Sequence, residues 1–133
     1  MTAPRHRILI VDDEESTRLL IARLLSRGMK VEAQLAGTCE QALRLARNYA
    51  YDAILLDLLM PGMGGMELLR LIRRSSANMA SPVLIVSVLG DRETVERGRD
   101  AGADAHLAKP VDERKLVAAV KKLLSARGKT RIP

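Results

Sequence analysis

The chain has 133 residues, 47% of them hydrophobic and 29% charged, a balance typical of one globular domain. Its net charge is +6, no apolar run is long enough to span a bilayer, and no secretory signal opens the chain. A single cysteine, Cys39, excludes an internal disulfide and fits a reducing compartment. We therefore expect a cytoplasmic protein with no membrane partner.

Basic residues gather toward the end of the chain. From Arg114 onward there are seven Lys or Arg and no Asp or Glu. This pattern is typical of a solvated helix face with a tail, and it also fits a patch for an acidic partner or nucleic acid. Charge alone does not decide between them. The chain has two tyrosines and no other aromatic residue, which disfavours base stacking, so we expect no nucleic-acid partner for this domain.

Strand and helix patterns alternate along the whole chain. In chain order, we expect a strand at 7–11, a helix at 16–27, a strand at 30–36, a helix from 39 to about 48, a strand at 54–56, a helix from 65 or 66 to 72, a strand at 82–87, a helix at 91–101, a strand at 105–108 and a helix at 113–124. The acids at 12–15 suit the first turn of a helix. Residues 75–81 are polar and small, which indicates a loop.

Local signals mark several of these boundaries. Gly28 is expected to stop the first helix, and Thr38 and Asp112 are expected to cap the second and the last. The helix at 91–101 has few apolar positions and carries Gly98 in its middle. We expect it to be the least stable helix, by about 1 kcal/mol for the glycine alone.

Five strands that alternate with five helices predict an α/β fold, a doubly wound parallel sheet with right-handed crossovers and helices on both faces. In such sheets, ligands bind at the carboxyl ends of the strands where the strand order reverses. Polar residues stand at four of these ends: Asp12 and Asp13, Asp57, Ser87 and Lys109.

These groups suit the transfer of a phosphoryl group to a carboxylate. Clustered carboxylates repel one another and need a hard cation, and their oxygen atoms suit Mg²⁺ with retained waters. Asp57 ends a wholly apolar run and would be the nucleophile. Ser87 and Lys109 would hold the phosphoryl oxygens by a hydrogen bond and by charge.

The chain resembles a two-component response-regulator receiver domain over about residues 6–126. The resemblance is carried by residues 8–13 (ILIVDD), 56–65 (LDLLMPGMGG), Ser87, 102–105 (GADA) and Lys109-Pro110. It implies a flavodoxin-like (βα)5 fold with strand order 2-1-3-4-5. It also implies that Asp57 accepts a phosphoryl group from a sensor histidine kinase or a phosphotransfer protein. Such a domain is not an enzyme beyond catalysing its own phosphorylation and dephosphorylation.

The resemblance assigns roles to individual residues. Asp13, Asp57 and the backbone carbonyl of Leu59 would bind Mg²⁺ (or Mn²⁺), with Asp12 acting mainly through water. Ser87 and Lys109 would contact the phosphoryl group. Lys109-Pro110 would be a cis peptide, because cis bonds are far less costly before proline.

The switch position of the family departs from its usual residue. Three residues before the lysine, receiver domains usually have Tyr or Phe, which follows the Ser87 position inward on activation, and here the residue is His106. An imidazole could do the same, but its charge would become relevant near neutral pH. The alternative is a surface histidine with no role, and the sequence favours neither.

Four further positions depart from the family or tune it. Val88 replaces the preferred Ala and would narrow access to Asp57, and Gly64 replaces the usual Asp or Asn at a small loss of loop rigidity. Leu59 and Leu89 stand where the family tunes dephosphorylation. Neither leucine can orient a water, so we predict a long-lived phosphoryl group.

The sequence does not identify the protein or domain on which this receiver would act. We expect residues 1–126 to form the receiver domain and 127–133 to be a basic tail or the start of a linker. The chain is then either a stand-alone regulator that acts on a downstream effector or one domain cut from a protein with its own output domain. Homodimerisation would use the face of the 91–101 helix, the 105–108 strand and the last helix.

Other functions were weighed against this one. A flavodoxin-type cofactor binder needs a phosphate loop and flanking aromatics, which the sequence lacks, and the glycine run at 62–65 does not match the dinucleotide fingerprint. An aspartyl phosphatase usually carries a second Asp where this chain has Leu59. The remaining alternative is a receiver-like interaction module that is never phosphorylated, and the intact acidic, hydroxyl and amine set argues against it.

Overall fold

The computed structural model describes residues 5–75 and 77–130, the last four of them by their backbone alone. The strands are β1 (His6–Val11), β2 (Val31–Ala36), β3 (Ala53–Leu56), β4 (Val83–Ser87) and β5 (Ala105–Ala108). The helices are α1 (Glu15–Gly28), α2 (Cys39–Asn48), α3 (Gly65–Arg73), α4 (Arg92–Ala101) and α5 (Glu113–Thr130). None of the described helices has the length and apolarity that a membrane crossing requires.

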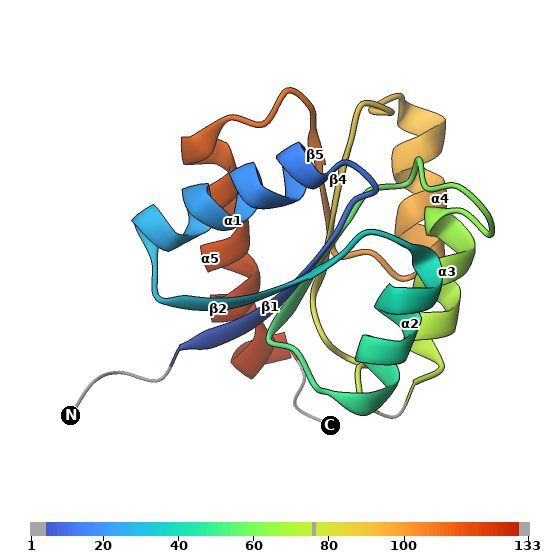
Figure 1. The fold of residues 1–133 in the computed structure, drawn as a ribbon, viewed down its shortest axis with the longest axis horizontal. Helices are drawn as coiled ribbons and strands as arrows, with labels where there is room; N and C mark the ends of the chain where they lie inside the picture. The colour runs from blue at the N-terminus through green and yellow to red at the C-terminus, as the bar shows by residue number, and fades with distance from the viewer. Residues whose placement is uncertain (1–4, 76, 131–133) are drawn as a thin grey trace.

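The strands form one parallel sheet in the order β2-β1-β3-β4-β5, which confirms the predicted fold class and strand order. Helices α1 and α5 cover one face of the sheet, and α2, α3 and α4 cover the other (Figure 1). Alternate residues of β1 therefore enter separate cores: Ile8 and Ile10 pack toward α1 and α5, and Leu9 and Val11 pack toward α2 and α3. All residues of β3 and β4 are buried, as expected for central strands of a parallel sheet.

Most element boundaries agree with the predictions to within a residue or two. The predicted Thr38 cap is present, since its hydroxyl accepts a hydrogen bond from the Gln41 amide. Of the four acids at 12–15, which the sequence predicts in the first turn of a helix, only Glu15 belongs to α1. Helix α5 continues through residues 127–130, which we had expected in a tail. The rest of that tail, 131–133, lies outside the described residues.

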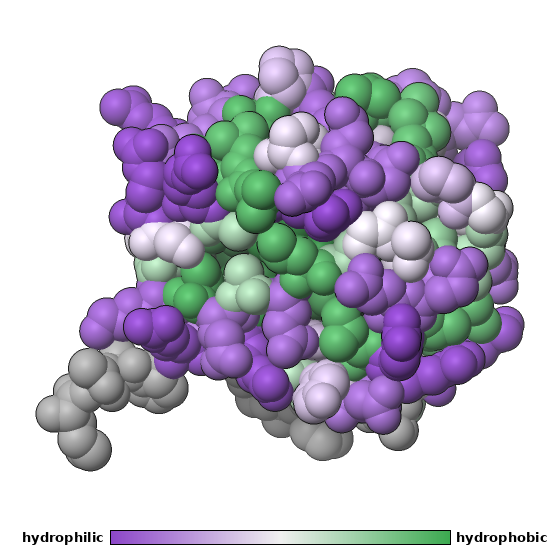
Figure 2. Space-filling view, in the orientation of Figure 1, coloured by the Kyte–Doolittle hydropathy of each residue, from purple (hydrophilic) through white to green (hydrophobic). Residues whose placement is uncertain are grey.

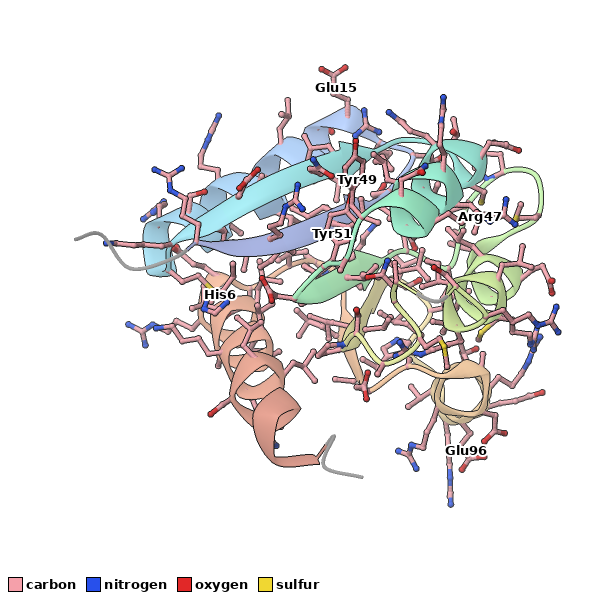
Figure 3. The ribbon with its side chains drawn as sticks, turned by 90° about the horizontal axis from the view of Figure 1, so that it is seen from below. His6, Glu15, Arg47, Tyr49, Tyr51 and Glu96 are labelled. Carbon is pink, nitrogen blue, oxygen red and sulfur yellow. The ribbon has the colours of Figure 1, made fainter. Side chains whose placement is uncertain are left out.

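Helix α4 lies close to the sheet because its inward residues are small. Gly98 is buried, and a Cβ at this position would lie 2.7 Å from Cδ1 of Ile85 in β4. Gly98 therefore permits a close approach of α4 to the sheet, besides its cost to helix stability. The outer face of α4 is polar, and Glu96 points away from the rest of the molecule (Figure 3).

The described residues between α3 and β4 form a loop, as expected, but several of its polar side chains are buried. Asn78 is fully buried, and its side chain bonds to backbone groups of Ala46, Tyr49 and Tyr51. These bonds tie the start of β3 to the end of α2, on the side of the sheet opposite the carboxyl ends of the strands. A polar sequence in this segment therefore serves the interior of the molecule.

A second polar centre lies beside this segment, at the side chain of Arg73. Its guanidinium donates to the carbonyls of Asn78 and Ser81, and to the Gly102 carbonyl at 2.7 and 3.0 Å. It also contacts the carboxylate of Asp104. Arg73 therefore joins the end of α4 to the segment that leads into β4.

Candidate functional site

The strand order brings the four predicted strand ends together. Asp57 continues the sheet beyond β3, because its amide donates to the Val11 carbonyl at 3.0 Å. Lys109 does the same beyond β5, donating to the Ser87 carbonyl at 2.9 Å. Side chains that follow β1, β3, β4 and β5 therefore meet at the edge formed by the carboxyl ends of the strands. In sheets of this type, ligands bind at this edge, near the point where the strand order reverses.

Three carboxylates cluster at this edge. Oxygen atoms of Asp12, Asp13 and Asp57 all lie within 4.8 Å of one another. Asp12 is 1% exposed and Asp57 is 5% exposed, while Asp13 faces solvent. Two buried carboxylates and a third at the rim exceed the charge of the single amine beside them, and all donors are oxygen. This donor set fits a hard dication such as Mg²⁺ or Mn²⁺.

The Leu59 peptide lies next to this cluster. Its amide donates to Oδ1 of Asp57 at 3.1 Å, so the turn after β3 is folded back onto the carboxylate. Gly65 makes this turn possible, because a Cβ there would lie 2.5 Å from the Asp57 carbonyl oxygen. No local pattern in the sequence indicates this role of Gly65, because the carbonyl that it approaches belongs to the preceding strand end. That the backbone carbonyl of Leu59 binds the metal stays a prediction.

Lys109 supplies the amine of the site. Its Nζ lies 2.8 Å from Oδ2 of Asp12 and 3.1 Å from Oδ2 of Asp57, and its side chain is 13% exposed. Burial by itself would lower the pKa of Lys109, but hydrogen bonds to the two carboxylates outweigh it and raise the pKa above its ordinary value of 10.5. The amine is therefore charged at neutral pH. The Lys109-Pro110 peptide bond is cis.

Ser87 and His106 are linked through the backbone of Leu89. The Leu89 amide donates to the Ser87 hydroxyl at 3.2 Å, and Nε2 of His106 lies 2.8 Å from the Leu89 carbonyl oxygen. The second contact is a hydrogen bond when Nε2 carries the proton. The loop after β4 is thus held from both sides, by a hydroxyl at the site and by an imidazole from β5.

The other ring nitrogen of His106 is in a different environment. Among the described residues, its Nδ1 is the one buried side-chain nitrogen or oxygen without a hydrogen-bond partner. His106 also lines a cavity of about 60 Å³ under α4, together with Ile85, Val95 and Arg99. The histidine is therefore half-buried between the sheet and α4, and not a fully exposed surface residue.

The rim of the site is apolar. Leu59 (50% exposed) comes from the turn after β3, and Val88 (61%) and Leu89 (38%) come from the loop after β4. Met63 follows Leu59 on the same turn but lies beside Leu43 and Arg44 of α2. Apolar surface over the β4–α4 loop is visible at the upper right of Figure 2. Gly64 has a φ of 82° and a ψ of 160°, a positive-φ conformation that is essentially restricted to glycine.

Arg18 of α1 is a further residue near the site, and it is not among the residues predicted from the sequence. Its Nη1 donates to the backbone carbonyl of Asp12 at 2.7 Å. A polar residue of an amphipathic helix has no sequence signal for such a contact, because only the fold determines which carbonyl lies within its reach.

Comparisons with known proteins agree with this geometry. The family model for the response regulator receiver domain matches residues 8–121. The DNA-binding response regulator MtrA of Mycolicibacterium smegmatis is 35% identical over 121 residues, which are 91% of this chain and 51% of that protein. The chain thus spans about half the length of the curated relatives that it matches first.

Solved structures are similar over nearly the whole chain. A CheY-like receiver domain protein from Methanospirillum hungatei has a TM-score of 0.87 at 28% identity, with 96% of this chain and 99% of that chain covered. The receiver domain of sensor histidine kinase PA1611 from Pseudomonas aeruginosa, with a magnesium ion coordinated in its active site cleft, has a TM-score of 0.83 at 25% identity. The alignment covers 92% of this chain and 99% of that one.

Proposed function

The chain belongs to the response regulator receiver domain family, whose members act in two-component signalling and are not classical enzymes, and on this premise we propose that it is a phosphorylation-activated switch. Asp57 accepts a phosphoryl group from a sensor histidine kinase or a phosphotransfer protein. The observation that carries the proposal is the position of Lys109 Nζ, 3.1 Å from Asp57 in a cluster of three carboxylates. The amine supplies positive charge beside the nucleophile, and the three carboxylates would hold a dication that supplies more.

The chemistry follows from the positions of these side chains. An Asp57 carboxylate oxygen attacks the phosphorus, the bond from phosphorus to the donor breaks, and an acyl phosphate forms. Asp12, Asp13, Asp57 and the Leu59 carbonyl would hold Mg²⁺ or Mn²⁺, which supplies positive charge for the phosphoryl oxygens. Lys109 is already charged beside the nucleophile and would exchange a carboxylate for a phosphoryl oxygen.

The signal would leave the site through the loop after β4. The Ser87 hydroxyl accepts a hydrogen bond from the Leu89 amide, so a movement of Ser87 toward a phosphoryl oxygen, to which it would donate its proton, would move this loop as well. The Leu89 carbonyl is bound by His106, so a shift of this loop changes the packing of His106 against α4. We assign His106 as the switch residue on this basis, and the face of α4, β5 and α5 as the surface that changes.

The partners follow from the same proposal. The donor kinase or phosphotransfer protein would meet the apolar rim of the site and the exposed Leu19 and Leu20 of α1. The output would be a downstream effector or an output domain in the same protein, and the relative MtrA is a DNA-binding regulator about twice as long as the matched region. Homodimerisation through the face of α4, β5 and α5, and a cytoplasmic location, belong to this proposal too.

Phosphorylation can be tested directly. The protein is incubated with acetyl phosphate and Mg²⁺, and its intact mass is measured for the wild type, for Asp57→Asn and for the control Asp100→Asn, which changes an exposed carboxylate of α4. The wild type and the control should gain one phosphoryl group and Asp57→Asn none. No added mass on the wild type would favour the interaction module, and equal labelling of all three would place the nucleophile elsewhere.

A further inference from the structure

Arg18 spans the carboxyl ends of two neighbouring strands. Its Nη1 donates to the Asp12 carbonyl, which follows β1, at 2.7 Å. The same guanidinium lies against Gly37, which follows β2, so closely that a Cβ on Gly37 would lie 2.7 Å from Nη1. The φ of Gly37 is not in the left-handed region, so the backbone conformation does not call for glycine, and an added Cβ would meet only the guanidinium, which would have to move.

The contact completes the fixation of Asp12. The Asp12 amide donates to the Ala36 carbonyl at 3.2 Å, Oδ1 accepts from the Glu14 amide at 2.9 Å, and Oδ2 binds Lys109 at 2.8 Å. Arg18 binds the remaining backbone group, the carbonyl. That carbonyl belongs to the peptide that joins Asp12 to Asp13. The orientation of this peptide therefore determines the direction in which the Asp13 side chain leaves the backbone.

We propose that Arg18 is a positioning residue that holds the Asp12–Asp13 turn in the geometry required for divalent-cation binding. The inference rests on the proposed function, because it concerns the cation at the same site. Arg18 would touch neither the cation nor the phosphoryl group, and it would act through the Asp12–Asp13 peptide. Groups that orient metal ligands in this way are typically worth about 10- to 100-fold in metal affinity.

The sign of the effect separates positioning from electrostatics. A guanidinium beside three carboxylates repels a dication, so if its charge alone mattered, removing it would tighten Mg²⁺ binding. A positioning role predicts the opposite, weaker binding on removal of the same charge. Arg23 offers a matched control, since it is an exposed arginine on the same helix.

The experiment measures Mg²⁺ affinity by calorimetry for the wild type, Arg18→Gln, Arg18→Lys and Arg23→Gln. We expect Arg18→Gln to weaken binding by about 10-fold or more, Arg18→Lys to recover part of the loss, and Arg23→Gln to bind like the wild type. Hydrogen exchange of the Glu14 amide in metal-free protein should be faster in Arg18→Gln, because the turn that protects it is loosened. Unchanged or tighter Mg²⁺ binding by Arg18→Gln would overturn the inference.

A double-mutant cycle with Gly37→Ala tests the contact itself. The added methyl group should push the guanidinium away and weaken Mg²⁺ binding in the wild type, but should have little effect when Arg18 is already Gln. Additive losses would overturn the inference and leave the proposed function intact. A wild type that binds no Mg²⁺, or binds it equally after Asp13→Asn, would overturn both.

Discussion

Asp57 and Asp12 share one cation, because Nζ of Lys109 is hydrogen-bonded to Oδ2 of both carboxylates. Both carboxylates are almost fully buried, and a single amine cannot balance them. A buried charge that lacks a full partner costs stability. In the metal-free site, the two carboxylates are therefore expected to repel each other and to destabilise the fold. A bound dication, with or without a phosphoryl group, would reduce this repulsion.

The first prediction concerns Asp57→Asn. An amide keeps an oxygen for the Leu59 amide but removes one negative charge, so we expect metal-free Asp57→Asn to be more stable than the wild type by about 1–2 kcal/mol. Mg²⁺ should raise the melting temperature of the wild type more than that of the variant. Thermal unfolding with Mg²⁺ and with a chelator measures both effects. Equal stability of the two metal-free proteins would contradict the expected repulsion.

Lys109→Met removes the amine and leaves two buried carboxylates unpaired, at a cost of about 3 kcal/mol at neutral pH. Because the pKa of Lys109 in the folded protein lies above its ordinary value of 10.5, the amine stabilises the fold fully below that value. This contribution is lost as the pH rises through the raised pKa. Urea unfolding of both proteins from neutral to strongly alkaline pH should show a constant difference that shrinks only above 10.5. A difference that disappears already near neutral pH would be inconsistent with the raised pKa.

His106 is expected to make switching depend on pH. Imidazole changes its charge between about pH 5 and 8, and the groups nearest to His106 include Arg99 and Asp104, which line the same cavity, and Asp91 at the start of α4. The extent of phosphorylation, or binding to an activated-state partner, should vary over this range in the wild type and less in His106→Tyr. If both proteins respond alike, the assignment of His106 as a switch residue fails.

The phosphoryl group is expected to persist. Leu59 and Leu89 are exposed at the rim and have no side-chain atom that can orient a water toward the phosphorus. Replacing Leu59 by Asn or Glu should shorten the lifetime of phosphorylated Asp57, whereas Met63→Gln, on the same turn but beside α2, should not. Loss of phosphate from the wild type within seconds in a Mg²⁺ buffer would refute this prediction.

Gly98 and Ile85 allow a test of how α4 approaches the sheet. Alanine at position 98 favours the helix by about 1 kcal/mol, but its methyl would meet Cδ1 of Ile85, and overpacking costs about 1–3 kcal/mol. We expect Gly98→Ala to destabilise the protein. In Ile85→Val, which lacks Cδ1, the same substitution should become neutral or stabilising. Urea unfolding of the wild type, the two single variants and the double variant measures how Gly98→Ala changes the free energy of unfolding in each background. A loss of the same size in both backgrounds would exclude the contact with Ile85 as its cause.

Local sequence determined the architecture and the chemistry of the strand ends. Short apolar runs alternate with helical spacing, and parallel strands bring their carboxyl ends to one edge, so Asp12, Asp57 and Lys109 could be placed near one another before any coordinates. Thr38 was recognised as a helix cap because its partner, Gln41, is three residues away. Signals of this kind act within a few residues and need no knowledge of the tertiary fold.

Tertiary structure alone decided which groups hold the site and the helices around it in place. Arg73 bonds to Gly102, Asn78 bonds to Ala46, and Gly98 meets Ile85, and no pattern in the sequence pairs these residues. Their partners are backbone carbonyls or side chains on other elements, which become neighbours only when the sheet and its helices assemble. Arg18 is the same case at the site itself: its sequence shows a charged helix residue, and only the fold places the Asp12 carbonyl within its reach.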